Sequence, residues 1–305
     1  MKVGVVMPIG PVEGTGVVPA WEATRLAALA TEEAGFDSAW VYDHLLFRGL
    51  GSDSTEGIHE CWTILSALAA ITRRVELGIL VLAMPFRSPA LLAKMAATLE
   101  EVSGGRLILG VGCGWHEPEF SAFGFPFDHR VSRFEEALSV LVPALRDGRA
   151  SFAGRYQAVR DLEIVPRHAR PDGRPTPLLI AGRGERMLRL VVQHADAWNT
   201  AWLGPATQLP PRLVGLHAAL EAAGRDPASL EITVGLNVVL PDFADADHPP
   251  LPITDSTLTG SPAELAEALH GYAELGVGHV QVALEPTTPP AIHHLGQALS
   301  LLRSR

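Results

Sequence analysis

The sequence predicts a (β/α)8 barrel, and three observations lead to this prediction. Apolar segments with β character alternate with helical segments from one end of the chain to the other, giving eight strand–helix units. The length of 305 residues suits a barrel, whose usual size is about 250 residues plus insertions. The alternative, a doubly wound open sheet, would carry a glycine fingerprint after its first strand, where this chain has Pro8, Pro11 and Pro19.

The first four units are read from short apolar runs and from apolar residues that recur every three to four positions. The first helix ends at Gly35, and the third is stopped by Ser103, Gly104 and Gly105. The predicted strands are Lys2–Met7, Asp37–Tyr42, Val75–Leu82 and Leu107–Val111, and the predicted helices are Trp21–Ala34, Cys61–Ile71, Ala90–Val102 and Arg133–Arg146.

The last four units follow an interruption. Residues 151–165 alternate in character around Gly154, which predicts a β-hairpin or a loop excursion. We therefore expect one domain over residues 1–305, with an insertion at about 147–176 after the fourth strand. The remaining predicted strands are Leu178–Ala181, Ala197–Thr200, Glu231–Val239 and His279–Ala283, and the helices are Arg186–His194, Leu213–Ala223, Ala263–Leu275 and Ala291–Leu302.

The composition argues against several classes of function. A formal net charge of −10 argues against a nucleic-acid-binding surface. No run of about 18 apolar residues occurs, so we expect no membrane span. The N-terminal MKVGVVMPIG is too short and too rich in glycine for a signal peptide. Cys61 and Cys113 lie far apart and match no metal-binding spacing, so we expect a cytoplasmic protein without a metal site.

The fourth predicted strand carries the most informative motif, RLILGVGCGWHEPEF. Gly110, Gly112 and Gly114 alternate at its end, which removes side chains from one face and lets backbone N–H groups approach a planar or phosphate-bearing ligand. Trp115 and Trp202 could form an aromatic wall, whereas we expect Trp40 to pack in the core. For Glu117 and Glu119 two interpretations stay open: contacts to a hydroxylated or cationic group, or acids in the first turn of a helix.

Two further motifs follow predicted strands, at the face where barrels carry their active sites. Asp43 and His44 form either a proton-transfer site or a cap with a polar loop residue. The turn Gly182–Glu185 opens a helix and is either a phosphate site, with Arg183 adding charge, or an ordinary tight turn. Only His44 is well placed for a metal, and no P-loop is present.

These blocks resemble the bacterial-luciferase-like superfamily of flavin- and deazaflavin-dependent oxidoreductases. The resemblance covers most of residues 1–205, and beyond them only the strand–helix pattern agrees. The matching blocks are GFDSAWVYDH (35–44), the segment from LGILVLAMPF to WHEPEFSAFG (77–124), RVSRFEEAL (130–138) and PLLIAGRGERMLRLVVQHADAWNTAW (177–202).

The resemblance implies a (β/α)8 fold with an insertion after the fourth strand that covers the active face. It implies FMN or the deazaflavin coenzyme F420 at the strand ends, and a non-prolyl cis peptide between Leu80 and Val81 beneath the ring. Asp43 would orient His44 or touch the cofactor. The residues expected to hold the ring edge, side chain and phosphate are Gly112, Cys113, Gly114, Trp115, Ala181, Gly182, Arg183 and Gly184.

The resemblance also bears on the cofactor. The Asp-His pair resembles the deazaflavin branch, and the uncharged Cys113 stands where FMN monooxygenases often carry a basic phosphate-binding residue. The function that follows is F420-dependent hydride transfer to or from a small organic substrate, with His44 as the proton acceptor or donor. The alternatives are an FMN-dependent monooxygenase fed by a separate flavin reductase, a flavin-carrying protein without chemistry, and a metal-dependent hydrolase. The resemblance implies a homodimer.

Overall fold

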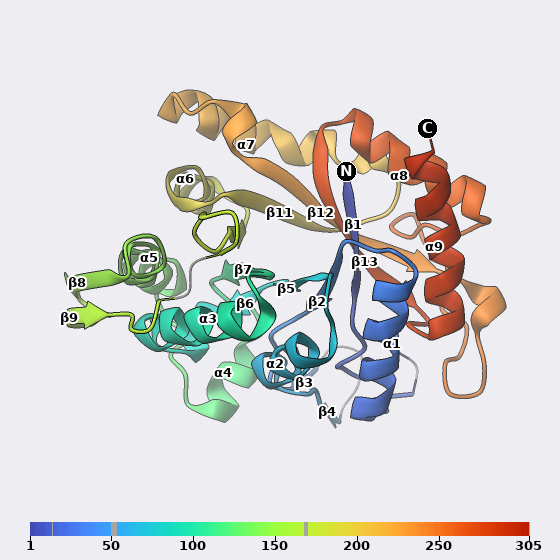
Figure 1. The fold of residues 1–305 in the computed structure, drawn as a ribbon, viewed down its shortest axis with the longest axis horizontal. Coiled ribbons are helices and arrows are strands. Elements are labelled where there is room, and N and C mark those ends of the chain that lie inside the picture. The colour runs from blue at the N-terminus through green and yellow to red at the C-terminus, as the bar shows by residue number, and fades with distance from the viewer. Residues whose placement is uncertain (14, 50–53, 168–169, 305) are drawn as a thin grey trace.

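The computed structural model describes residues 1–13, 15–49, 54–167 and 170–304. Within these residues eight parallel strands close into a barrel, as predicted, because the last strand pairs with the first and β7 pairs with β10 (Figure 1). The barrel strands are β1 (Lys2–Val6), β2 (Ser38–Val41), β5 (Glu76–Ile79), β7 (Leu107–Gly112), β10 (Leu178–Ala181), β11 (Ala197–Leu203), β12 (Glu231–Val239) and β13 (Val277–Glu285).

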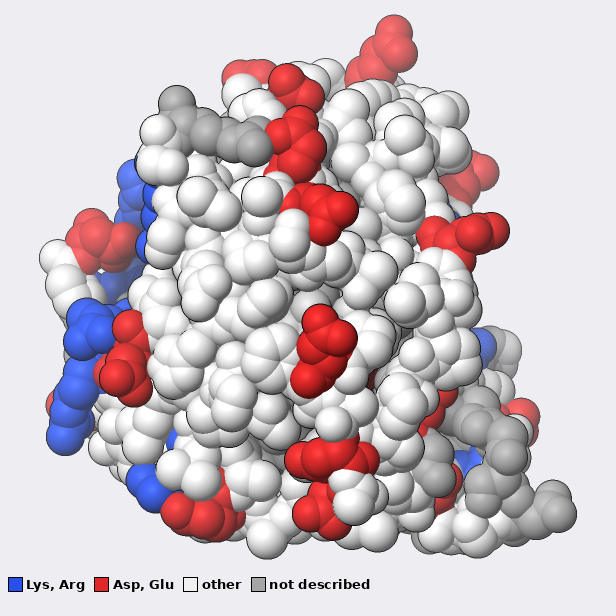
Figure 2. Space-filling model, turned by 90° about the vertical axis from the view of Figure 1, so that its right-hand side faces the viewer, with Lys and Arg blue, Asp and Glu red and all other residues white. Residues whose placement is uncertain are grey.

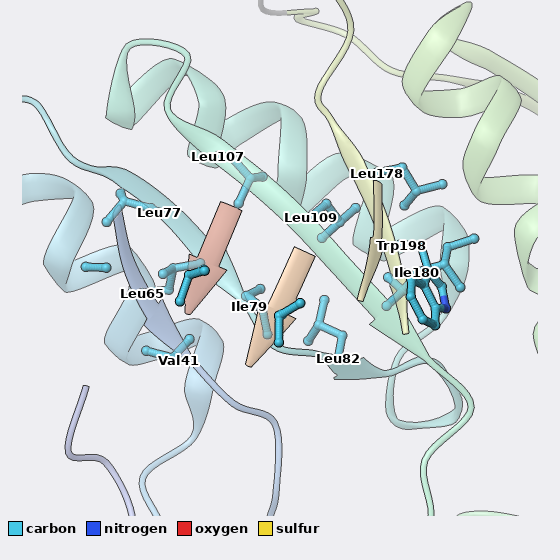
Figure 3. Close-up of a cluster of buried hydrophobic side chains, with 14 of the residues drawn as sticks. Val41, Leu65, Leu77, Ile79, Leu82, Leu107, Leu109, Leu178, Ile180 and Trp198 are labelled. Carbon is cyan, nitrogen blue, oxygen red and sulfur yellow. The ribbon is translucent and has the colours of Figure 1, made fainter. Parts of the chain in front are cut away.

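Helices surround the barrel, and an apolar layer lies between them and the strands. Figure 3 shows part of this layer, in which Leu65 of α2 lies beside Leu77 and Ile79 of β5. Its side chains come from alternate positions on each strand, because successive strand residues point to opposite faces. The outer helices are α1 (Trp21–Glu33), α2 (Cys61–Ile71), α3 (Pro89–Ser103), α5 (Arg130–Arg146), α6 (Glu185–His194), α7 (Pro210–Ala223), α8 (Pro262–Glu274) and α9 (Pro289–Arg303).

The third unit departs from the prediction of one strand over 75–82. The structure divides it into β5 and the short β6 (Leu82–Ala83), with a non-prolyl cis peptide between Leu80 and Val81. The cis bond implied by the resemblance is thus confirmed. The dividing residues form a bulge, because β6 pairs with β7 further along the barrel, at Val111 and Gly112. Short elements outside the predicted units are β3 (Phe47–Arg48), β4 (Thr55–Glu56) and α4 (Glu117–Phe123). Glu117 and Glu119 lie in the first turn of α4, as one of their two interpretations expected.

Inside the barrel, the N-terminal half is filled around Trp40, which is fully buried, as predicted. Gly4 and Gly78 make room for its indole, since a Cβ on Gly78 would lie 2.1 Å from the ring. The indole N–H donates to the Ser38 hydroxyl at 2.7 Å, and that hydroxyl lies 2.7 Å from His279 Nε2. Burial lowers the pKa of His279 to about 3, so this histidine is neutral.

A hairpin of β8 (Arg149–Ala153) and β9 (Ala158–Glu163) lies within the predicted insertion and projects beside α5 (Figure 1). The Glu136 carboxylate of α5 holds the hairpin turn. It accepts hydrogen bonds from the backbone N–H groups of Arg155, Tyr156 and Gln157 at 3.0, 2.6 and 2.9 Å. The hairpin is therefore fixed to the outer ring of helices.

The surface agrees with the composition. Figure 2 shows the face over α1 and α9, where acidic side chains are scattered and basic side chains lie at the edge. Among its described residues this face has no basic cluster of the kind that nucleic-acid phosphates require. None of the described helices is both long enough and apolar enough to span a bilayer.

Candidate active site

A cavity of about 800 Å³ opens at the C-terminal ends of the barrel strands. Its volume lies within the range of about 300–1,000 Å³ that is usual for small-molecule and cofactor sites. Every predicted site residue lines it except Gly184, which is the N-cap of α6. The predicted residues that the structure brings together here are Asp43, His44, Leu80, Val81, Gly112, Cys113, Gly114, Trp115, Ala181, Gly182 and Arg183.

His44 is held by Glu119, which stands in the first turn of α4. Its Nδ1 lies 3.0 Å from one carboxylate oxygen, and the other oxygen accepts the backbone N–H of Leu45 at 2.8 Å. An ionised carboxylate accepts hydrogen bonds, so Nδ1 carries the proton and Nε2 is left for exchange with a ligand. Among the described residues Nε2 has no hydrogen-bond partner. Glu119 is 1% exposed and His44 is 15% exposed, so the dyad has one sealed side and one open side.

Asp43 does not orient His44, and that part of the expectation is wrong. Its two oxygens instead accept hydrogen bonds from the Arg87 guanidinium at 2.7 and 3.1 Å. They also accept the backbone N–H of Ala83 at 2.9 Å and the Cys61 thiol at 3.1 Å. With these donors Asp43 is saturated inside the protein and joins the loop after β2 to the turn after β6. A direct contact between Asp43 and a cofactor remains a proposal.

Asp43, Glu60 and Cys61 place potential metal-binding atoms close together. However, the Arg87 guanidinium donates to both carboxylates and lies 3.7 Å from the Cys61 sulfur, so a positive charge already balances this cluster. Burial and the nearby Asp43 charge raise the pKa of the Cys61 thiol, which keeps it in the protonated form that metals bind poorly.

The glycines of β7 have a packing role that the sequence did not predict. A Cβ on Gly110 would lie 1.9 Å from the Ile79 carbonyl oxygen, and a Cβ on Gly112 would lie 2.9 Å from the Val81 side chain. These two glycines therefore make room for the Leu80–Val81 bulge. Gly114 has a φ of 72°, which few other residues adopt. The repeated glycines shape the floor of the cavity through the neighbouring strand.

The turn after β10 has the features of an anion site. Arg183 lines the cavity and has no ion-pair or hydrogen-bond partner among the described residues. Gly184 has a φ of 85°, and a Cβ placed on it would meet no atom within 4 Å, so the start of α6 is open to a ligand. Trp115 and Trp202, which are 57% and 40% exposed, stand at the cavity wall as the sequence suggested.

The cavity contains one orphaned polar atom that bears on whether a cofactor fits. The Thr200 hydroxyl is buried, lines the cavity, and has no hydrogen-bond partner among the described residues. Such a group is costly unless a ligand or water satisfies it. Together with the open turn at Arg183 and the bulge at Leu80–Val81, it fits a planar, anion-bearing ligand.

The hairpin does not cover the active face. No residue of the predicted insertion that the structure describes lines the cavity, so this expectation is wrong for the described part of the chain. The reason is the attachment of the hairpin turn to Glu136 of α5. From residues 205–260 only His248 reaches the cavity.

Sequence reasoning missed three features of the site. It did not assign Glu119 to His44, it did not pair Arg87 with Asp43, and it ended the eighth strand before Glu285, which lines the cavity. Glu119 was visible as a first-turn acid, but its partner lies 75 residues away in the chain.

Comparison with known proteins identifies a family and relatives for this chain. A model of the luciferase-like monooxygenase family matches residues 1–247. A pyrimidine monooxygenase RutA from Cronobacter turicensis is 30% identical over 248 residues, which cover 75% of this chain and 63% of the relative. A phthiodiolone/phenolphthiodiolone dimycocerosates ketoreductase from Mycobacterium kansasii is 33% identical over 228 residues, covering 70% of this chain and 61% of the relative. The chain thus spans less than two thirds of the length of these relatives.

Solved structures agree on the fold. An EDTA monooxygenase from Chelativorans sp. BNC1 has a TM-score of 0.79 at 15% identity, with 100% of this chain and 94% of the other covered. An F420-dependent secondary alcohol dehydrogenase in complex with an F420–acetone adduct has a TM-score of 0.77 at 20% identity, with 99% of each chain covered. The family match over residues 1–247, on a closed barrel of this kind, shows that the chain belongs to the luciferase-like monooxygenase family.

Proposed function

We propose that this chain is an oxidoreductase that binds a flavin-type ring in the cavity and uses the His44–Glu119 dyad to move a proton. The observation that carries the proposal is the dyad itself. One nitrogen of His44 is fixed by a sealed carboxylate, and the other is left to the cavity. A positioned imidazole of this kind serves general acid–base catalysis.

On this proposal, different residues of the cavity have different roles. When bound, the ring would supply the redox chemistry. The Leu80–Val81 bulge and the segment Gly112–Trp115 would support its face and edge. Ala181–Gly184, with the Arg183 guanidinium and the start of α6, would take an anionic group. His44 Nε2 would give a proton to the substrate or take one from it, while Glu119 fixes the imidazole through its contact with Nδ1.

The first candidate for the reaction is monooxygenation with reduced flavin and oxygen. Its support is the family match and the likeness to pyrimidine monooxygenases at 30% and 31% identity. On this proposal the partner would be a separate flavin reductase. The sequence alone favoured the deazaflavin, so the comparisons shift the order of the two candidates.

The second candidate is hydride transfer with the deazaflavin coenzyme F420. Its support is the dyad, since a hydride given to a carbonyl group must be accompanied by a proton, and the uncharged Cys113 in the glycine turn. Burial raises the pKa of the Cys113 thiol, so that position offers no charge, positive or negative, to a phosphate.

Titration of the purified chain with FMN and with F420, followed by absorbance and calorimetry, tests the proposal. Saturable binding of one of them is expected, and failure of both to bind would overturn the proposal. The bound cofactor then decides between the candidates. His44→Asn should retain cofactor affinity while turnover falls by about a hundredfold or more. His217→Asn, on the exposed face of α7, is the matched control and should change neither.

The assembly belongs to the same proposal. We propose a homodimer, as the family resemblance implies, and sedimentation of the purified chain checks it.

A further inference from the structure

Glu285 differs from the other carboxylates of the cavity. It is the last residue of β13 and lines the cavity between the first and eighth strands. Asp43 and Glu119 are both saturated by protein donors. The Glu285 carboxylate has no hydrogen bond and no ion pair with any residue that the structure describes. It is therefore the acid in this wall that is left for a ligand.

Among the described residues no lysine or arginine acts on Glu285, and the one group of opposite charge that does is His248. The charged or titratable groups that act on it are Glu13 in the loop after β1, His248 in the loop after β12 and Tyr42 at the end of β2. Glu13 repels it. His248 already pairs with Asp245 at 3.0 Å, and the Tyr42 hydroxyl accepts the backbone N–H of Gly10. Burial and the Glu13 charge raise the pKa of Glu285 to about 7, so half of the molecules carry the charge near neutral pH.

The rest of this wall is mainly apolar. The cavity lining from the first and last strand–helix units includes the apolar residues Pro8, Val12, Ala23, Leu26, Leu284 and Pro289, together with Thr287 and Thr288, and Tyr42 and His248 also line the cavity. A single carboxylate in an apolar wall selects ligands by charge, because burying it without a donor is unfavourable and a cation removes that penalty. A carboxylate on the ligand would be repelled by both Glu285 and Glu13, so such a ligand should bind more weakly.

We propose that Glu285 is the residue that determines substrate specificity, selecting substrates with a cationic amine or N–H donor over substrates with a carboxylate. This inference rests on the proposed function in one respect, that the cavity is the substrate site. On this basis the cavity has two polar groups with different roles. His44, held by Glu119, moves the proton, and Glu285 recognises a cationic or N–H group of the substrate.

Calorimetric titration of the full chain with three matched compounds tests the proposal: phenethylamine, phenethyl alcohol and phenylacetate. They share a ring and differ in the charge at one end. At pH 8 the amine should bind at least about tenfold more tightly than phenylacetate, as expected for one charge-assisted hydrogen bond. Glu285→Gln should reduce this ratio to about twofold or less, and Glu285→Arg should invert the order of the two compounds.

Glu221→Gln is the control, because it removes the same charge from the exposed face of α7 and should leave the ratio unchanged. Thermal unfolding checks that each variant is folded, and if the arginine variant does not fold, the glutamine variant decides. A wild-type ratio near one, or an unchanged ratio in Glu285→Gln, overturns the proposal. The titrations with FMN and F420 are separate. If the chain binds a cofactor but does not distinguish the amine from phenylacetate, only the role of Glu285 is refuted. If it distinguishes the two compounds but binds neither cofactor, only the proposed function is refuted.

Discussion

The two ends of the barrel treat polar groups in opposite ways. At the closed end, the side chains of Trp40, Ser38 and His279 form a hydrogen-bonded chain, and burial keeps His279 neutral. At the open end, His44 has one nitrogen fixed, and its other nitrogen, the Thr200 hydroxyl and the Glu285 carboxylate have no partner among the residues that the structure describes. The same alternation of strand residues thus produces a sealed core and a reactive cavity. The difference lies in whether the partner is supplied by the protein or by a ligand.

The largest effect is expected where the open end depends on a buried charge pair. Arg87→Met should lower the free energy of unfolding by about 3–5 kcal/mol, because it leaves Asp43 charged and without its main partner. Chemical denaturation measures this. Adding Asp43→Asn should recover part of the loss. Arg186→Met, which removes the exposed pair with Glu135, should cost less than about 1 kcal/mol. Equal losses in the two arginine variants would mean that the buried pair stabilises the fold no more than the exposed pair does.

Glu119 is expected to act as a positioning residue for His44. Glu119→Gln should lower turnover by about a hundredfold, equivalent to about 2.7 kcal/mol, with cofactor affinity retained. The loss should appear in kcat rather than in KM, because the Glu119 carboxylate fixes the imidazole of His44. Glu117→Gln, an exposed acid in the same turn, serves as the control. A loss of turnover accompanied by an equal loss of cofactor affinity would reduce Glu119 to a structural role.

Ionisation of Glu285 should lower the free energy of unfolding. Its pKa is about 7 in the folded chain, above the ordinary 4.5. The free energy of unfolding therefore begins to fall as the pH rises above 4.5, and the loss is complete above pH 7. Glu285→Gln should therefore raise the free energy of unfolding by about 1–3 kcal/mol at pH 8 and change it little at pH 4.5. Denaturant melts at the two pH values measure this. An equal effect at both values would refute the assignment.

His279 should make the closed end sensitive to acid. Its pKa in the folded chain is about 3, below the ordinary 6.5. Between these values the unfolded chain binds a proton that the folded chain does not bind, so the free energy of unfolding falls as the pH drops below 6.5. The loss is about 1.4 kcal/mol per pH unit. His279→Gln should flatten this slope between pH 6 and pH 4, whereas His217→Gln should not. Identical slopes in all three proteins would contradict the buried neutral state.

The sequence predicted the barrel because its evidence is local. Apolar runs, helix periodicity and stop signals at Gly35 and Gly104 each depend on a few neighbouring residues. The division of the third strand could not be read in this way, because its apolar run continues unbroken through the bulge at Leu80 and Val81. The family resemblance, rather than the pattern, located that bond.

The candidate site was predicted as a set of residues but not as a set of contacts. Motifs such as Asp43–His44 identify which side chains reach the strand ends. The partner of each side chain is decided by contacts between different strand–helix units, 75 residues apart for His44 and Glu119 and 44 residues apart for Asp43 and Arg87. Glu285 escaped prediction because a carboxylate is significant here only through the absence of a partner, and that is a property of the folded chain.

The placement of the tryptophans has a practical consequence for work on this protein. Trp40 and Trp198 are fully buried, whereas Trp115 and Trp202 stand exposed at the cavity wall. The emission spectrum should accordingly contain a blue component from the interior and a red component from the cavity. A ligand that enters the cavity should quench the red component first, and unfolding should shift the blue component. One spectrum can then separate occupancy of the site from loss of the fold without any attached dye.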